Sequence, residues 1–215
     1  MDRILTPLGC SVWLSCMAAA RKLVIPPGAS PLPDWSYSTV WTLYTLWTYA
    51  TFSTINELLG PFPTLSAALI SFAPTATAVS VLITALYLGL VFHEDKTLSV
   101  KYRRICPRYL YWQMAIHCFA PVGVLLHARL PVDALAADAG RFTFGYTCSF
   151  AVLQYVAFIV LKKTHGVWPY DFMQTFKVWH HVSFFAFVLL ALLSIALTLS
   201  NLTVWAGDTP VKSVV

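Results

Sequence analysis

Six apolar stretches, each close to the length of a membrane crossing, dominate this sequence. They cover roughly residues 4–20, 35–58, 64–92, 108–128, 142–161 and 179–204, and each is bounded by charge, proline or glycine. A bilayer core about 30 Å thick needs about 20 apolar residues in a helix, since each residue advances the helix by about 1.5 Å. The pattern predicts an all-α, polytopic membrane protein. Its six transmembrane helices would form one bundle, with residues 1–215 as a single domain.

Composition excludes several classes of partner and cofactor. Of the residues, 58% are apolar and 11% are charged, unlike a soluble globular domain. The net charge of +5 is spread over loops and forms no basic patch, so we expect no nucleic acid partner. The cysteines are odd in number and form no C-x-x-C pair, so we expect neither a disulfide framework nor a zinc site. They are Cys10, Cys16, Cys106, Cys118 and Cys148.

The first stretch and the loops predict an orientation. Arg21 and Lys22 follow the first apolar stretch instead of preceding it, which favours a first crossing over a cleaved signal. Six crossings put both chain ends on one side, here side A, which receives 4 basic residues against 10 on the opposite side B. Side A holds Arg3, Arg129, Arg141 and Lys212; side B holds Arg21, Lys22, Lys96, Lys101, Arg103, Arg104, Arg108, Lys162, Lys163 and Lys177. The positive-inside rule makes side B cytosolic or matrix-facing.

A row of threonines lies in the second stretch. Residues 38–54 read STVWTLYTLWTYATFST, with threonine at positions 39, 42, 45, 48, 51 and 54. On a helix, a period of three turns each successive side chain back by about 60°, so the row spirals and forms no single stripe. Most of these hydroxyls are expected to bond a carbonyl three or four residues earlier in their own helix. A threonine with a chemical role must meet a partner on another helix.

His117 is the histidine that lies well inside an expected crossing, within YWQMAIHCFAPVGVLL. Counted from side B, Thr42 lies about 10 Å along the second stretch and His117 about 13 Å along the fourth, so they can share a depth. A hydroxyl and an imidazole at one depth can form a nucleophile and general base. The structural alternative is a buried histidine that donates to a backbone carbonyl.

Both residues lie in segments that resemble a known family. WTLYTLWTYATF is similar to the threonine-bearing segment of the androgen-induced membrane proteins, a family of six-helix, multi-pass hydrolases of fatty acid esters of hydroxy fatty acids. Thr42 falls at the family's threonine position, with Leu46, Ala50 and Phe52 in register. IHCFAPVGVLL resembles the histidine segment, with His117 at the histidine position.

Two further segments carry the same resemblance in the same order. SFAP followed by the apolar run to YLGLVFHED resembles the third helix of the family, and Pro74 in it predicts a late start, a tilt or a kink. KKTHGVWPYDF resembles the motif that follows the fifth helix, with Gly166, Trp168 and Tyr170 at the family's spacing.

The resemblance implies an intramembrane ester hydrolase without a cofactor or metal ion. Thr42 would be the nucleophile and His117 the base, acting on a lipid or fatty-acyl ester among membrane lipids. Gly166, Trp168 and Tyr170 would contribute to substrate binding by closing the side B mouth of a cavity. The resemblance assigns no oxyanion donor; the position of Gln113, one turn before His117, makes it the candidate from the residues. The family implies an endoplasmic reticulum location.

Two other functions remain open from the residues. A non-catalytic accessory subunit of a larger membrane complex, such as a mitochondrial inner-membrane assembly, would use the same scaffold with other membrane subunits as partners. A b-haem protein is a weaker alternative, because haem needs two histidines at one depth. His93, His165, His180 and His181 fall in the side B interface instead.

Overall fold

The protein is described by a computed structural model that covers residues 2–24, 37–60, 62–92, 111, 114–115, 117, 120–128 and 139–207. Within these residues all regular structure is helical, which confirms the all-α prediction. The helices are α1 (Asp2–Val24), α2 (Ser38–Leu58), α3 (Pro63–Leu86), the π-helical turn η2 (Tyr87–Val91), α6 (Ala120–Ala128), α7 (Ala139–His165), α8 (Asp171–Gln174) and α9 (Val178–Gly207).

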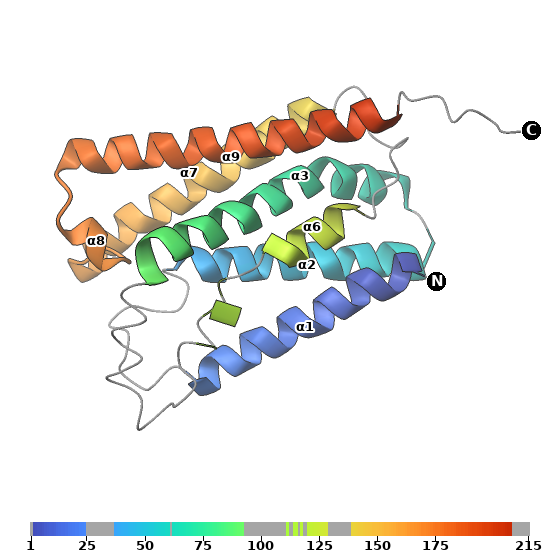
Figure 1. The fold of residues 1–215 in the computed structure, drawn as a ribbon, viewed down its shortest axis with the longest axis horizontal. Coiled ribbons are helices and arrows are strands. Elements are labelled where there is room, and N and C mark those ends of the chain that lie inside the picture. The colour runs from blue at the N-terminus through green and yellow to red at the C-terminus, as the bar shows by residue number, and fades with distance from the viewer. Residues whose placement is uncertain are drawn as a thin grey trace, which may run out of the picture.

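The long helices run along one common axis, and successive helices alternate in direction when the short α6 is counted, so that α3 and α7 run parallel (Figure 1). The helix α3 lies at the centre and contacts α2, α6, α7 and α9, while α1 packs on α2 and α7 packs on α9. One end of the bundle holds the start of α1 and the end of α9 (Figure 1). The opposite end gathers the start of α2, the end of α3 and the short helix α8 (Figure 1).

Three segments are long and apolar enough to cross a membrane: Pro63–Val91, Phe142–His165 and Val178–Ser200. The prediction of six crossings is therefore not supported as a whole. In α1 only Ile4–Ala19 forms an apolar stretch, and that stretch is shorter than a full crossing. In α2 a hydroxyl at every third position lowers the hydropathy. Much of the fourth expected crossing, 108–128, lies outside the described residues.

The third helix does not start late, which was one of the expected alternatives. It begins at Pro63, where a proline costs no helical hydrogen bond, and it continues through Pro74 to Leu86. The five residues of η2 then widen the last turn, so that the Phe92 N–H bonds the Tyr87 carbonyl oxygen. Turns of this kind often occur where a helix borders a functional site.

Small side chains make α3 the shared wall of the bundle. Every residue from 73 to 80 is buried, and the set consists of alanine, threonine, proline, valine and serine. Small residues let helix backbones approach closely in a membrane, and their hydroxyls bond across the interface. Thr75 Oγ1 lies 2.9 Å from Thr147 Oγ1 on α7, and Thr77 Oγ1 donates to the Gly123 carbonyl oxygen on α6 over 3.1 Å.

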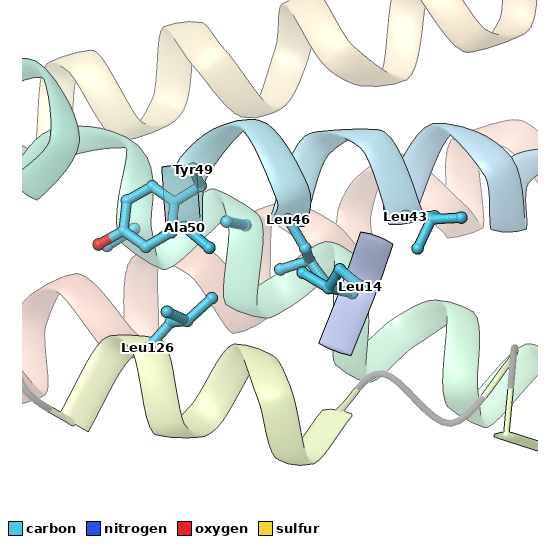
Figure 2. Close-up of a cluster of buried hydrophobic side chains, with 8 residues drawn as sticks. Leu14, Leu43, Leu46, Tyr49, Ala50 and Leu126 are labelled. Carbon is cyan, nitrogen blue, oxygen red and sulfur yellow. The ribbon is translucent and has the colours of Figure 1, made fainter. Parts of the chain in front are cut away.

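The apolar core on the α1 side of the bundle joins four helices. Figure 2 shows Leu14 of α1, Leu126 of α6 and the α2 side chains that meet between them. Leu14, Leu46 and Ala50 are fully buried. This core sets the rotation of α2 about its axis. The face of α2 opposite the core therefore points toward α7 and α9.

Candidate functional site

A narrow cavity lies at the end of the bundle where α2 begins. The cavity has a volume of about 50 Å³. Most of its described lining is apolar and comes from α3, η2, α7, α8 and α9. Its polar lining consists of Ser38, Thr39, Tyr87, His117, Gln154 and Tyr170. Apolar walls with a few convergent polar groups are typical of a site for a largely apolar ligand.

His117 is one of the polar residues in this cavity. Its ring stacks on the ring of Tyr87, with centroids 4.0 Å apart and planes 12° apart. Its backbone carbonyl oxygen accepts a hydrogen bond from Thr84 Oγ1 over 3.0 Å, which ties this segment to α3. The sequence therefore identified a histidine that faces a cavity between helices.

Thr42 is not among the described residues that line this cavity. Its side chain is 0% exposed, and its Oγ1 donates to the Ser38 carbonyl oxygen over 2.9 Å. Thr54 makes the same bond to the Ala50 carbonyl oxygen over 2.8 Å. These two threonines follow the back-bonding expected of most of the row, which satisfies each hydroxyl within its own helix.

The other threonines of the row meet different neighbours, as a spiral requires. Thr51 Oγ1 lies 2.9 Å from Ser11 Oγ on α1. Thr45 and Thr48 line an open groove on another face of α2. Thr39 lies in the His117 cavity, where it interacts with the Tyr170 side chain. Among the described threonines of α2, Thr39 is the one that shares a cavity with His117.

Tyr170 fastens the segment after α7 to the start of α2. The Ser38 N–H donates to the Tyr170 hydroxyl over 3.1 Å, which satisfies one of the free N–H groups of the first turn. Burial raises the pKa of the Tyr170 phenol above 10.0, while hydrogen bonds with Ser38 and Thr39 oppose that rise. The phenol is therefore neutral at physiological pH and acts as a hydrogen-bonding group.

Gly166 and Trp168 support this segment from outside the cavity. Gly166 adopts a φ of 73°, a left-handed conformation that suits glycine at the end of a helix. Trp168 stacks on His181 of α9, with ring centroids 4.1 Å apart. Neither residue is among the described lining of the cavity. Gln113 lies outside the described residues.

Metal binding and disulfide formation have no candidate in the described part of the chain. No three side chains of His, Cys, Asp or Glu gather there closely enough to hold a metal ion. Cys10, Cys16 and Cys148 form no disulfide among the described residues, and the other two cysteines lie outside them.

Sequence reasoning missed four polar members of the cavity: Ser38, Thr39, Tyr87 and Gln154. Thr39 belongs to the threonine row, but the direction in which its side chain points depends on the rotation of α2 about its axis. Gln154 stands alone among apolar residues in FAVLQYVAFIV. A search for ionisable groups passes over it, although a buried amide needs hydrogen-bond partners just as a buried charge does.

Comparison of the chain with protein-family models, curated proteins and solved structures finds no match. The fold and the cavity therefore define the protein by class. Its described part is all-helical, with three helices long and apolar enough to cross a membrane and a mostly apolar cavity that contains a histidine.

Proposed function

We propose that this protein hydrolyses lipid esters, of the class of fatty acid esters of hydroxy fatty acids, in the cavity that contains His117. The observation that carries this proposal is the meeting of an imidazole with serine, threonine and tyrosine hydroxyls inside an otherwise apolar cavity. An acyl chain needs apolar walls, and ester cleavage needs a nucleophile and a base. The cavity offers both kinds of surface, and it must widen to admit an acyl chain, because its volume is about 50 Å³.

In the proposed reaction, His117 removes the proton from a threonine hydroxyl as that oxygen attacks the ester carbonyl carbon. The tetrahedral intermediate collapses, the bond to the alkoxy oxygen breaks, and the leaving alcohol takes the proton from His117. Water then attacks the acyl-threonine with His117 again as base. This step releases the fatty acid and restores the threonine hydroxyl.

Two hydroxyls on α2 are proposed as the nucleophile. Thr42 is the residue that the family resemblance indicates, but it must break its bond to the Ser38 carbonyl and turn toward the cavity. Thr39 lies three residues before Thr42 and already lines the cavity beside Tyr170. The geometry favours Thr39, and the resemblance favours Thr42.

The segment after α7 has a supporting role in this proposal. Tyr170 would contact the substrate, because it lines the cavity. Gly166 and Trp168 would hold that segment in place through the left-handed turn and the stack on His181. Gln113 remains a candidate oxyanion donor because of its position one turn before His117 in the sequence.

The proposal includes a membrane arrangement with six crossings, side B facing the cytosol, in the endoplasmic reticulum. The alternation of successive helices, α6 included, and the shared end of α1 and α9 support an even number of crossings (Figure 1). The accessory-subunit function uses the same scaffold without chemistry, and the hydrolysis experiment below separates the two.

The experiment uses the purified full-length chain in lipid nanodiscs with a fluorogenic long-chain ester. We expect hydrolysis by the wild type and a loss of at least about 100-fold in His117→Asn, since a general base contributes about 10²-fold or more. Thr39→Val and Thr42→Val keep the side-chain shape and remove one hydroxyl each. The variant that abolishes turnover identifies the nucleophile.

Thr54→Val is the matched control, because Thr54 makes the same back-bond as Thr42 but is not among the described lining of the cavity. Its turnover should equal that of the wild type. Wild-type turnover no higher than that of His117→Asn would overturn the hydrolase proposal and leave the accessory-subunit function. Full turnover in both Thr39→Val and Thr42→Val would exclude an α2 threonine nucleophile.

A further inference from the structure

Gln154 is the buried polar side chain of the cavity whose donor is unused. It lies on α7, it is 6% exposed, and it lines the cavity together with His117. Its Nε2 atom has no hydrogen-bond partner among the described residues. A buried donor without a partner destabilises the folded state, so its presence in an apolar cavity calls for an acceptor.

Other buried polar side chains of α7 do have hydrogen-bond partners, so an unused donor is not a general feature of this helix. Thr143 Oγ1 donates to the Ser71 carbonyl oxygen over 2.9 Å, and Thr147 Oγ1 lies 2.9 Å from Thr75 Oγ1. Both threonines are satisfied at the contact with α3. Gln154 lies two turns further along, where α7 borders the cavity instead of packing on a polar partner.

The lining also limits the chemistry of the missing acceptor. No lysine, arginine, aspartate or glutamate is among the described residues of the cavity wall, and most of the wall is aliphatic or aromatic. A carboxylate or phosphate would enter without a cation to balance it, which is costly in an apolar site. A neutral carbonyl oxygen attached to an acyl chain satisfies the donor and suits the walls.

We infer that the Gln154 amide donates a hydrogen bond to the carbonyl oxygen of a neutral acyl ligand. If the proposed hydrolysis is correct, on which this second role rests, the same N–H group stabilises the oxyanion that forms when the ester carbonyl is attacked. Gln154 is then a residue that contacts the reacting atoms, on the wall shared with His117 and Thr39.

Gln154→Met tests the kinetic role, because methionine keeps the length of the side chain and removes the donor. We expect kcat on the fluorogenic ester to fall about 10²-fold with KM little changed, as for the loss of one oxyanion donor. The thermal midpoint of the variant should not fall, because the substitution removes an unsatisfied polar group. Thr147→Val is the matched control on α7: it loses an interhelical bond, so its midpoint should fall while its kcat stays at the wild-type value.

A second measurement does not depend on turnover. A long-chain ketone labelled with carbon-13 at its carbonyl group is bound to the full-length protein in nanodiscs, and the carbonyl chemical shift is recorded. A hydrogen bond from Gln154 should move the resonance downfield relative to the same ketone in empty nanodiscs, and Gln154→Met should abolish that displacement.

The two measurements separate this inference from the hydrolase proposal. A displacement that depends on Gln154, in a protein without ester hydrolysis, would support carbonyl binding and reject the hydrolase. Equal chemical shifts and equal kcat in wild type and Gln154→Met would overturn the inference while leaving hydrolysis in place. A lower thermal midpoint in Gln154→Met would also count against it, because it would show that the amide stabilises the fold without a ligand.

Discussion

Single hydroxyl groups carry many of the polar contacts between these helices. Thr77 bonds the Gly123 backbone, and Thr84 bonds the His117 backbone, in both cases across two segments far apart in the sequence. A hydroxyl is small enough to sit between close backbones, and it satisfies a carbonyl that water does not reach. The position of each hydroxyl is therefore decided by the backbone opposite it.

Gly123→Ala should destabilise the fold, because the closest approach of α6 to α3 leaves no space for a methyl group. A Cβ atom at Gly123 would overlap Ser80 Oγ and would lie 3.2 Å from Thr77 Cα. Overpacking of this kind costs about 1–3 kcal/mol. The measurement is the unfolding midpoint in detergent, and Gly145→Ala is the control because nothing lies within 4 Å of its added Cβ. Equal midpoints for the two variants would contradict the close packing.

Tyr170→Phe should lower stability at neutral pH, because the Ser38 N–H loses its acceptor, at a cost of about 0.5–1.5 kcal/mol. The pKa of Tyr170 is raised by burial, so above pH 10.0 the unfolded chain ionises this phenol before the folded chain does. Ionisation of the unfolded state lowers the free energy of unfolding. The difference in stability between the wild type and Tyr170→Phe should therefore shrink as pH rises past that value. Unfolding midpoints of both proteins across this pH range measure the difference, and a gap that widened with pH would contradict the argument.

Among the elements, α3 determines the arrangement of the others, because it contacts α2, α6, α7 and α9. Its buried run of small residues allows these contacts on several faces at once. The helices α7 and α9 have a different character, since many of their large apolar side chains are exposed in the isolated chain. That pattern fits helices whose outer faces meet lipid.

The bond between Thr75 and Thr147 should couple α3 to α7 measurably. In a double-mutant cycle with Thr75→Val and Thr147→Val, we expect a coupling energy of about 0.6 kcal/mol, as for other hydrogen bonds between membrane helices. The measurement is unfolding by a denaturing detergent. Pairing Thr75→Val with Thr164→Val provides the control, because Thr164 bonds only within α7 in the described structure. Additive effects in the Thr75 and Thr147 pair would show that the bond contributes nothing.

The bounds of the elements were largely predictable, whereas their rotation was not. The stretches 35–58 and 179–204 correspond closely to α2 and α9, because apolar length is a local property of the sequence. The choice between Thr39 and Thr42 depends on the rotation of α2 about its axis, which changes by about 100° per residue. That rotation is set by the α1 core and by Tyr170, which lie far away in the sequence.

At the scale of the whole molecule, the alternating helices place the cavity at one end and predict which positions face each side of the membrane. In a variant without native cysteines, single cysteines at Tyr37 and Lys163 should react with an impermeant maleimide from side B. A cysteine at Phe62 should react from side A. Tyr37 precedes α2 and Phe62 follows it, so reaction of both from the same side would show that α2 does not cross.

The hydroxyl-rich α2 has a consequence for how the protein is made. Transfer of a helix of this composition into lipid alone is not very favourable. Packing on α1 and α3 gives it a serine hydrogen-bond partner and a close-packed apolar face. An α2 that crosses the bilayer would therefore need shelter at the translocation machinery until α3 emerges. The first three helices would then enter the bilayer together as one folding unit.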